Sequence, residues 1–512
     1  MPDALSTFEH IPALLAHQAR RFPSRPAISV NSEAPLPYAD WWVRSSAMSA
    51  VLRDTVQPGD PVALAFGSEH WPDFAEAYIA CQLAGGVPVP AKPTMTESEW
   101  HRFVEGCGVR HVVLSTAGDQ LAESVRARVA VHPHPQLRDV SSQASALNPG
   151  TATATPVSPL AHILHSSGTT GRPKAVAVTH RELLSGSRLP AGWAGLAMLH
   201  VMPPASAAGV EGVMLMALKS GVHATTVAPV EPADIARKAR DRDTRVLLLL
   251  PSVALMCLRA GELAEPVTHP RLVILMGSAT PPPVLRDLAR AFPKAQILTH
   301  YGATEAGTAQ LLMPFDAARP SAAGRAMGDT EVRVVDDEGR ETGPGVLGEV
   351  LLRRSGAPGR HFFGETDGQA SVFGPDGWVS TGDLGYLDES GYLYIVDRKK
   401  DIVVRGGQNI APSEVESALA EHPAVLEASA FGVPHDLWGE MLVAAVVPMA
   451  DAPVTVAELR RYLRARLAPF KIPSRITFVA ELPRNQLGKV EKAALRRAHE
   501  AVAESGSAPA DA

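Results

Sequence analysis

Cysteine is scarce in this chain, which has only Cys81, Cys107 and Cys257 among its 512 residues. Their odd number and wide spacing exclude a disulfide framework and match no zinc-binding pattern. Such cysteine usage fits a reducing compartment, so we expect a cytoplasmic protein. We expect each cysteine to fill a core rather than to act as a nucleophile.

A strong net charge is also missing. The chain has 48 Lys and Arg residues against 54 Asp and Glu residues, which gives a formal net charge of −6. No basic field is therefore available to attract nucleic acid or an anionic membrane. We expect the partners to be small molecules or another protein, and not nucleic acid.

Long apolar runs are absent as well. The most apolar run, Val246–Leu258, is interrupted by Pro251 and is shorter than the roughly 20 residues that cross a bilayer. This run predicts a buried strand that leads into a helix. Residues 1–20 contain no apolar core of the length that a signal peptide needs, so we expect neither export nor a membrane span.

The chain has what a globular protein needs. Hydrophobic residues make up 46% and charged residues 20%, which fits sizeable cores and, at this length, about three domains. Short β-rich runs alternate with helical patterns, which predicts an α/β fold with parallel sheets. The expected strands are Pro61–Ala65, His111–Ser115, Val246–Leu250 and Leu272–Met276, and the expected helices are Trp71–Ala84, Pro232–Asp241 and Pro283–Phe292.

The sequence changes its texture towards the C-terminus. From Gly345 onward short strands and glycine turns predict a β-rich subdomain that completes a large N-terminal domain, residues 1–399. A dense charge cluster at residues 397–401, with Gly406 and Gly407 behind it, is typical of a hinge. We expect a small, mobile C-terminal domain at residues 400–500. The composition of residues 501–512, rich in Ala, Ser, Gly and Pro, predicts a disordered tail.

The most informative stretch follows an apolar segment and combines hydroxyls, glycines and a cation: Ser166-Ser167-Gly168-Thr169-Thr170-Gly171-Arg172-Pro173-Lys174. Gly168 and Gly171 allow the backbone to turn so that N–H groups face phosphate oxygens, while the hydroxyls donate beside them. Lys174 adds a positive charge. Pro173 before the lysine and Ala175 after it exclude the Walker pattern. The stretch predicts a phosphate-binding loop of another nucleotide chemistry.

Five further motifs follow in order. They are Gly277-Ser278-Ala279, Tyr301-Gly302-Ala303-Thr304-Glu305, Ser380-Thr381-Gly382-Asp383-Leu384, Asp397 through Ile410, and Pro483-Arg484-Asn485-Gln486-Leu487-Gly488-Lys489. Together with the phosphate-binding loop they resemble the acyl-adenylate-forming superfamily, which includes acyl-CoA synthetases, aryl-CoA ligases, luciferases and peptide-synthetase adenylation domains. The resemblance extends from about Trp71 to Lys489. It implies a large AMP-binding domain of α/β subdomains with a β-rich subdomain, followed by a small mobile α+β domain.

The resemblance also implies a chemistry. A carboxylate attacks the α-phosphorus of ATP, pyrophosphate leaves, and the acyl-AMP is then transferred to a thiol. The thiol is that of coenzyme A or of a carrier-protein phosphopantetheine. Two anions meet in the first step, so Mg²⁺ and positioned donors are required. Such an enzyme is a ligase.

The resemblance assigns nucleotide contacts to specific residues. Thr169, Thr170 and Gly171 would hold the β- and γ-phosphates, where Lys174 would add charge. Tyr301 would stack on or flank adenine, and Gly277, Ser278 and Ala279 would line it. The other residues assigned to nucleotide binding are Ser166, Ser167, Gly168 and Gly302. Thr304 would contact phosphate, and Glu305 would bind Mg²⁺, a hard cation that prefers carboxylate oxygen. Asp383 would accept hydrogen bonds from both ribose hydroxyls, with Arg398 beside it.

Lys489 is the residue that the resemblance implies for the first half-reaction. It would bridge the substrate carboxylate and the α-phosphate, and it would not be needed for thioester formation. The hinge is expected at Lys400. Rotation about it would withdraw Lys489 and bring Gly406 and Gly407 to the thiol channel.

Departures from the family pattern bear on the acid. Ser206 stands in the segment 203–209 where coenzyme A ligases commonly carry histidine and amino-acid activators carry aspartate. Without that aspartate an α-ammonium group would be buried unpaired, so amino acids are poor candidates. We expect Ser206, Gly209, His300 and Gln310 to line a largely apolar pocket for an aromatic or medium acyl chain.

Several alternatives remain open at this point. The hinge sequence 405–416 looks more like acyl-CoA and aryl-CoA synthetases than like peptide-synthetase domains, which favours a free-standing ligase. The acceptor could instead be a carrier protein or an amine in a biosynthetic cluster, with unusual oxyanions such as nitrite included. A third reading is a degenerate nucleotide-binding protein, although retention of four functional charges, Lys174, Glu305, Asp383 and Lys489, argues against it. We expect His162 and His165 to be structural.

Overall fold

The computed structural model describes residues 8–116, 121–141, 156–166, 174–185, 189, 191–356, 359–364, 369–449, 452–485 and 488–504. The chain forms two compact units. The first comprises Met1–Pro320, Ala326–Glu331 and Leu352–Val379, and the second comprises Ser321–Arg325, Val332–Leu351 and Ser380–Ala512. Both combine helices and strands, so the predicted α/β class is confirmed.

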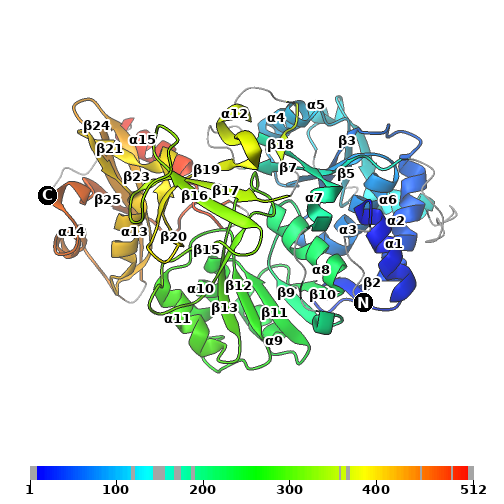
Figure 1. Ribbon diagram of the computed structural model, residues 1–512, viewed down its shortest axis with the longest axis horizontal. Coiled ribbons are helices and arrows are strands. Elements are labelled where there is room, and N and C mark those ends of the chain that lie inside the picture. Colours follow the sequence, from blue (N-terminus) through cyan, green and yellow to red (C-terminus); the bar gives the residue numbers. More distant parts are fainter. Residues whose placement is uncertain are drawn as a thin grey trace. The chain divides into compact units, whose positions relative to one another are not determined.

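An eight-stranded sheet dominates the first unit (Figure 1). Its order is β14-β13-β12-β11-β9-β10-β1-β2, and all neighbours from β13 to β1 are parallel. The strands are β1 (Pro26–Val30), β2 (Leu36–Pro37), β9 (Ala197–His200), β10 (His223–Thr226), β11 (Thr244–Leu249), β12 (Leu272–Leu275), β13 (Gln296–Tyr301) and β14 (Leu311–Pro314). Helices α9 (Pro232–Ala239), α10 (Pro251–Arg259) and α11 (Pro282–Ala291) pack beside these strands.

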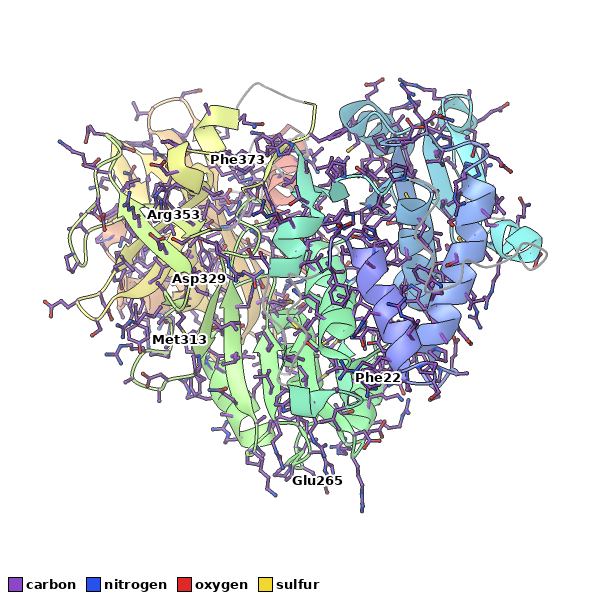
Figure 2. The ribbon with its side chains drawn as sticks, turned by 45° about the vertical axis from the view of Figure 1, so that its right-hand side comes forward. Phe22, Glu265, Met313, Asp329, Arg353 and Phe373 are labelled. Carbon is purple, nitrogen blue, oxygen red and sulfur yellow. The ribbon has the colours of Figure 1, made fainter. Side chains whose placement is uncertain are left out.

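A second, four-stranded parallel sheet lies nearer the N-terminus, in the order β4-β3-β5-β6. Its strands are β3 (Pro61–Ala65), β4 (Val87–Ala91), β5 (His111–Leu114) and β6 (Ala130–Pro133). The helices of this region are α1 (Ile11–Arg21), α2 (Tyr38–Leu52), α3 (Trp71–Leu83), α4 (Glu97–Cys107), α5 (Glu123–Arg126) and α6 (His134–Ser141). Buried side chains of α1, α2 and α3 join the main core, and Figure 2 shows how side chains fill the space around these helices.

A small three-stranded sheet completes the first unit. Strands β7 (Leu160–Ser166) and β8 (Lys174–Thr179) form an antiparallel hairpin in which Ser166 pairs with Lys174, and β18 (His361–Phe362) pairs with β8. Helix α7 (His180–Ser185) packs against β8. The first unit also contains the π-helix η4 (Ala208–Met214), α8 (Leu215–Ser220), which packs against η4 and β1, and α12 (Gln369–Val372). The hairpin carries both ends of the predicted phosphate-binding loop, whose residues 167–173 lie outside the described residues.

Two five-stranded sheets form most of the second unit. The first sheet has the order β15-β20-β19-β17-β16, with β15 (Gly324–Arg325), β16 (Thr330–Val335), β17 (Gly348–Arg354), β19 (Val379–Leu387) and β20 (Tyr392–Arg398). Residues 330–331 of β16 and 352–354 of β17 nevertheless belong to the first unit. The other sheet contains β21 (Val403–Arg405), β22 (Gln408–Ile410), β23 (Val425–His435), β24 (Gly439–Pro448) and β25 (Arg475–Phe478). Helices α13 (Pro412–Ala420), α14 (Val456–Arg464) and α15 (Lys492–Glu504) accompany this sheet.

Local sequence signals explain where many helices begin. Thr96 caps α4 and Thr455 caps α14. Each threonine hydroxyl accepts from the backbone N–H of a glutamate three residues later, Glu99 or Glu458, and that glutamate accepts from the threonine N–H. Two N–H groups that lack a partner within the helix are thereby hydrogen-bonded at each N-terminus. Proline occupies the first turn of α1, α3, α9, α10, α11 and α13, where its missing N–H costs no helical hydrogen bond. Helices α3 and α9 begin at the predicted residues, and α11 begins at Pro282, one residue before its predicted start.

The expected alternation of strands and helices is confirmed. Strand β3 has the predicted bounds, and the run Val246–Leu258 forms the end of β11 followed by α10. Helix α15 continues to Glu504, past residue 500, where the tail was expected to begin. No helix among the described residues is long and apolar enough to cross a membrane. The domain boundary at residue 400 stays a prediction.

One cluster of buried charges belongs to the framework of the first unit. Ligand atoms of Asp73, Glu76 and His134 lie within 4.8 Å of one another. Arg44 contacts Glu76 at 2.9 Å and Arg138 approaches Asp73 at 3.8 Å, so guanidinium groups already offset both carboxylates. His134 lies between them, 3.4 Å from Glu76 and 3.8 Å from Asp73. We interpret this cluster as a structural charge network that joins α2, α3 and α6.

Buried histidines make the stability of the fold depend on pH. Burial lowers the pKa of His200, which packs against Trp71, from 6.5 to about 3. The unfolded chain therefore binds a proton that the folded chain excludes, and stability present above pH 6.5 is lost as the pH falls towards 3. For one such group the loss between pH 7 and pH 5 is about 2 kcal/mol. We expect His200→Phe to lose less stability over this interval than the wild type, measured by urea unfolding at both pH values. Equal losses would contradict this prediction.

Candidate functional site

The predicted nucleotide and acid motifs of the first unit follow neighbouring strands of the large sheet. Residues 277–279 come after β12, residues 302–305 come after β13, and residues 203–209 come after β9. Because β9, β11, β12 and β13 are parallel neighbours, their carboxyl ends lie at the same edge. Ligands of open parallel sheets bind at that edge. The fold therefore brings together motifs that are up to about 100 residues apart in the chain.

The adenine-binding candidates lie at the surface of this edge. Gly277, Ser278 and Ala279 are exposed, and Gly277 has a φ of +97°. Tyr301, the last residue of β13, is half-buried. This arrangement leaves backbone groups and an aromatic ring accessible at neighbouring strand ends.

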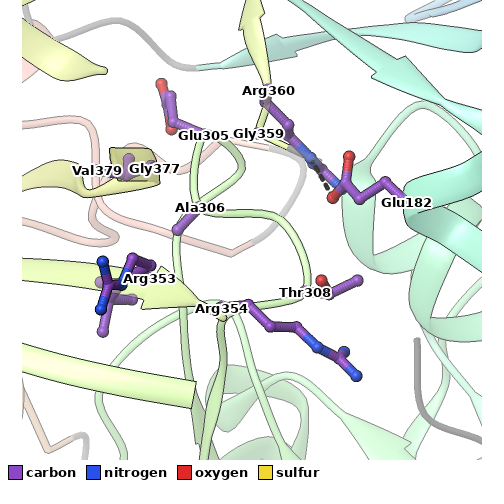
Figure 3. A pocket seen from close by; sticks show the side chains of 11 residues that line it. Glu182, Glu305, Ala306, Thr308, Arg353, Arg354, Gly359, Arg360, Gly377 and Val379 are labelled. Carbon is purple, nitrogen blue, oxygen red and sulfur yellow. Dashed lines mark hydrogen bonds and ion pairs between the residues drawn. The ribbon is translucent and has the colours of Figure 1, made fainter. Parts of the chain in front are cut away.

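Glu305 lines a pocket of the first unit (Figure 3). Its side chain is half-buried and makes no hydrogen bond or ion pair with any residue in the described part of the chain. Figure 3 shows it directed away from the ion pair between Arg360 and Glu182. Arg353 and Arg354 line the same pocket. An available carboxylate with guanidinium groups nearby suits a hard cation that carries a polyphosphate.

The loop that carries Glu305 is held from behind by buried charges. The Arg360 guanidinium donates to the Thr304 carbonyl at 2.6 Å, to Glu182 at 2.8 Å and to Glu211 at 2.9 Å. Glu211 also contacts His162 at 3.1 Å, and His162 contacts the Tyr78 hydroxyl at 2.7 Å. We call Arg360, Glu182, Glu211 and His162 the arginine cluster. Sequence analysis did not predict Arg360, Glu182 or Glu211 as site residues.

Burial and ion pairing have opposite effects on the pKa values of the carboxyl groups in the arginine cluster. Burial would raise the pKa of Glu211, but Arg360 and His162 outweigh it and lower this pKa to about 2. Burial raises the pKa of Glu182 despite the same guanidinium. Burial also lowers the pKa of His162. The side chains of Arg360 and Glu182 are only 1% and 3% exposed, so water cannot substitute for these contacts.

The substrate-pocket candidates Ser206 and Gly209 form a tight local turn. The Ser206 hydroxyl donates to the Pro203 carbonyl at 2.7 Å and accepts from the Gly209 N–H at 2.9 Å. A Cβ at Gly209 would lie 2.1 Å from the Pro203 carbonyl oxygen. The Ser206 hydroxyl is therefore used to shape the turn that follows β9.

The side chains of His300 and Gln310 both lie close to Gly302. A Cβ at Gly302 would lie 3.4 Å from atoms of both side chains. Burial lowers the pKa of His300, with a hydrogen bond to Gln310 acting in the opposite direction. The Gln310 amide donates to the Gly307 carbonyl at 3.1 Å. A neutral imidazole and an amide thus stand beside the adenine and magnesium candidates.

Only the two ends of the predicted phosphate-binding loop belong to the part of the chain that the structure describes. Ser167, Gly168, Thr169, Thr170 and Gly171 lie outside the described residues. Ser166 ends β7 and Lys174 begins β8. The Lys174 ammonium lies 4.5 Å from the centre of the Phe362 ring.

The ribose candidates belong to the second unit. Asp383 on β19 pairs with Arg398 on β20 in the antiparallel register, and their side chains form an ion pair at 2.8 Å. The Thr381 hydroxyl accepts from the Asp383 N–H at 3.1 Å and donates to the Val350 carbonyl at 2.8 Å. These contacts fix a carboxylate that is 7% exposed as a residue.

Lys489 lies in the same unit as Asp383. Its N–H donates to the Asn485 side chain at 3.1 Å, and the residues 486–487 between them lie outside the described chain. Burial, followed by the charge of Arg398, lowers the pKa of Lys489, whereas Asp383 opposes the shift. A desolvated ammonium interacts strongly with an anion that it meets.

The hinge candidates form two short structures. Lys400 lies in the turn Lys399–Asp401, and burial lowers its pKa while Asp401 opposes this. Gly406 and Gly407, with φ of +56° and +79°, form the two-residue connection between β21 and β22. Two successive positive φ values are the requirement of a type I′ hairpin turn, which glycine meets at little cost.

Two family models match the chain. The model for AMP-binding enzyme covers residues 15–357, and the model for AMP-binding enzyme C-terminal domain covers residues 414–489. The C-terminal match ends at Lys489.

Characterised proteins resemble the chain over most of its length. The fatty acid–[acyl-carrier-protein] ligase ScoC of Streptomyces coeruleorubidus is 31% identical over 93% of this chain and 94% of its own. The indoleacetate–CoA ligase of Aromatoleum aromaticum is 32% identical over 65% of this chain and 66% of its own. The ATP-bound crystal structure of MatB from Rhodopseudomonas palustris covers 96% of this chain and 100% of its own, with 27% identity and a TM-score of 0.81.

Proposed function

The chain belongs to the AMP-binding enzyme family, and from this premise we propose that it converts a carboxylic acid and ATP into an acyl-AMP and then a thioester. Its relatives include ligases of fatty and aryl acids, which supports acid activation as the shared reaction. The observation that carries the proposal is the Glu305 carboxylate, which lies beside Thr304 at the carboxyl edge of the parallel sheet and is paired with none of the described residues.

The first half-reaction needs charge stabilisation more than proton transfer. A carboxylate oxygen attacks the α-phosphorus of ATP, the bond to the bridging oxygen breaks, and pyrophosphate leaves with the electron pair. We propose that Lys489 stabilises the charge that develops on the carboxylate and the α-phosphate. Thr304 would donate its hydroxyl to phosphate. No general base is needed, because the carboxylate is already ionised at neutral pH.

Magnesium would supply charge neutralisation at the triphosphate. Glu305 fits this ion because its carboxylate has no other partner among the described residues and lines a pocket. Asp383, aligned by Thr381 and Arg398, would accept hydrogen bonds from the ribose hydroxyls. Tyr301 and residues 277–279 would flank adenine.

The acid is proposed to be an aromatic or medium acyl carboxylate. The Ser206 hydroxyl is occupied within its own turn, so this wall offers neither a counter-ion nor a free donor. The neighbouring Val210 is fully buried and apolar. A largely apolar wall favours apolar acyl groups over amino acids.

We propose coenzyme A as the first choice of acceptor. The relative from Aromatoleum aromaticum is a CoA ligase, which supports this choice, whereas the relative from Streptomyces coeruleorubidus uses an acyl carrier protein. Both acceptors could present the same thiol arm, so a carrier protein is the second candidate. An amine acceptor and a degenerate nucleotide-binding protein are the remaining alternatives.

Isotope exchange between pyrophosphate and ATP tests the activation step. We expect one class of acids, from a panel of fatty, arylacetic and benzoic acids with amino acids as the contrast, to support transfer of labelled pyrophosphate into ATP. Mass analysis with coenzyme A present would then show the thioester. Exchange with amino acids alone would refute the proposed acid class, and absence of exchange with every acid would refute the activation.

A further inference from the structure

The arginine cluster raises the question of why so many charges are buried behind one loop. Arg360 precedes β18, Glu182 lies in α7, Glu211 in η4 and His162 on β7. Each is separated from the others in the sequence, and all four side chains converge within the first unit. Burying such charges is costly, and a well-packed apolar core is often as stable. Stability alone therefore does not explain the cluster.

One nitrogen of the Arg360 guanidinium donates to a backbone carbonyl rather than to a carboxylate. Its Nη1 donates to the Thr304 carbonyl at 2.6 Å, while Nε and Nη2 are held by Glu182 and Glu211. The planar fork fixes all three directions at once, which a lysine cannot do. The carbonyl that is held belongs to the residue directly before Glu305.

Arg360 and Glu182 also contact the loop on the C-terminal side of Glu305. Gly307 packs so closely that a Cβ there would lie 2.1 Å from the Glu182 carboxylate and 2.5 Å from Arg360 Nε. Its φ of +58° also favours glycine. The Thr308 backbone forms a hydrogen bond with the Glu182 carboxylate. The loop is thus fixed at residues 304, 307 and 308, and Glu305 projects from between these points (Figure 3).

We infer that the arginine cluster is a positioning device for the magnesium-binding carboxylate, with Arg360 and Glu182 as its positioning residues. The inference rests on the proposed function, because it assigns Glu305 to the metal that accompanies ATP. Arg360 touches neither ATP nor metal in this scheme. It acts through the Thr304 carbonyl, and Glu182 acts through Gly307 and Thr308.

The test removes the cluster without leaving buried charges unpaired. In the triple variant Arg360→Met/Glu182→Gln/Glu211→Gln, every charged partner is replaced together, so destabilisation by an orphaned charge is avoided. The readout is retention of ATP by the whole protein at increasing Mg²⁺ concentration, measured by equilibrium dialysis. We expect the Mg²⁺ concentration for half-maximal retention to rise about 10-fold or more, as for loss of outer-shell support. Retention of ATP without Mg²⁺ should stay within about twofold of the wild type, since its adenine and ribose contacts are untouched.

Two further variants make the result decisive. Arg360→Lys keeps the charge but cannot hold three oxygens, so we expect the same increased Mg²⁺ requirement even if the triple variant fails to fold. Arg44→Met/Glu76→Gln removes an ion pair elsewhere in the first unit, in which Glu76 is buried and Arg44 is partly exposed. It should lower the melting temperature and leave the Mg²⁺ requirement unchanged.

The outcomes separate this inference from the proposed function. A wild-type protein that retains no ATP at any Mg²⁺ concentration overturns the proposed function and the inference with it. If the wild type instead retains ATP in an Mg²⁺-dependent way while folded Arg360 variants show the same Mg²⁺ requirement, the positioning role alone is overturned. An equal increase in the Arg44→Met/Glu76→Gln control would also overturn it, since general loosening would then explain the effect.

Discussion

Replacement of Lys489 by alanine is expected to reduce acid-dependent pyrophosphate exchange by about 10²–10³-fold or more, the range found when one donor to a developing charge is removed. The physical reason is that an ammonium group at the α-phosphate would act only while two anions approach each other. Thiolysis of a supplied acyl-AMP lacks that encounter and should stay within a few-fold of the wild type. The two half-reactions are measured separately, by exchange and by thioester formation from synthetic acyl-AMP.

Lys471→Ala provides the matched control for this experiment. Lys471 also lies in the second unit, where it pairs with Glu414 at 2.6 Å. Removal of one surface ion pair changes stability by at most about 1 kcal/mol, so both half-reactions should persist. An equal loss of both half-reactions in Lys489→Ala would contradict the assigned role.

Replacement of Glu305 by glutamine is expected to have the second largest effect. The amide preserves the shape of the side chain but removes the negative charge that would bind Mg²⁺. We expect exchange to fall by about 10²–10³-fold and the Mg²⁺ requirement for ATP retention to rise. The measurement is exchange at saturating acid over a range of Mg²⁺ concentrations.

Glu265→Gln is the control for charge removal on the first unit. Glu265 is exposed. Figure 2 shows it well separated from Arg353, which lines the Glu305 pocket. This variant should keep the wild-type Mg²⁺ dependence. If Glu305→Gln also kept it, the metal assignment would be wrong.

The parallel strands explain why candidate motifs that are far apart in the sequence lie at one edge of the sheet. The motif at residues 277–279 follows the predicted strand Leu272–Met276, which forms β12, whereas the neighbouring β13, which ends at Tyr301, was not among the expected strands. Once the strands are identified, their carboxyl ends must meet. The pairing of Asp383 with Arg398 is similarly local, since both lie on adjacent antiparallel strands joined by a short connection.

The arginine cluster could not be predicted in this way. Arg360 is 178 residues from Glu182 and 149 residues from Glu211, and it lies outside the six motifs on which the resemblance was based. Isolated charged residues in a sequence normally indicate exposed positions. Their burial depends on tertiary contacts between β18, α7 and η4, for which hydrophobic periodicity gives no signal.

Ser206 shows a different limit of sequence reasoning. Its place in the segment where the resemblance expects histidine or aspartate predicted a change in the proposed acid pocket, but the sequence did not show what the hydroxyl would contact. The structure shows that it bonds within its own turn, to Pro203 and Gly209. A small polar side chain next to a glycine can satisfy its own backbone, and only coordinates distinguish this from an open donor.

The most direct test of acid activation follows an oxygen atom. The acid is labelled with ¹⁸O in its carboxylate and converted to the thioester with ATP and coenzyme A. If the carboxylate attacks the α-phosphorus, cleavage of the acyl–oxygen bond leaves one carboxylate oxygen on AMP, and mass spectrometry should find one ¹⁸O atom in AMP and none in pyrophosphate. Label in inorganic phosphate, with ADP as the other product, would contradict the account.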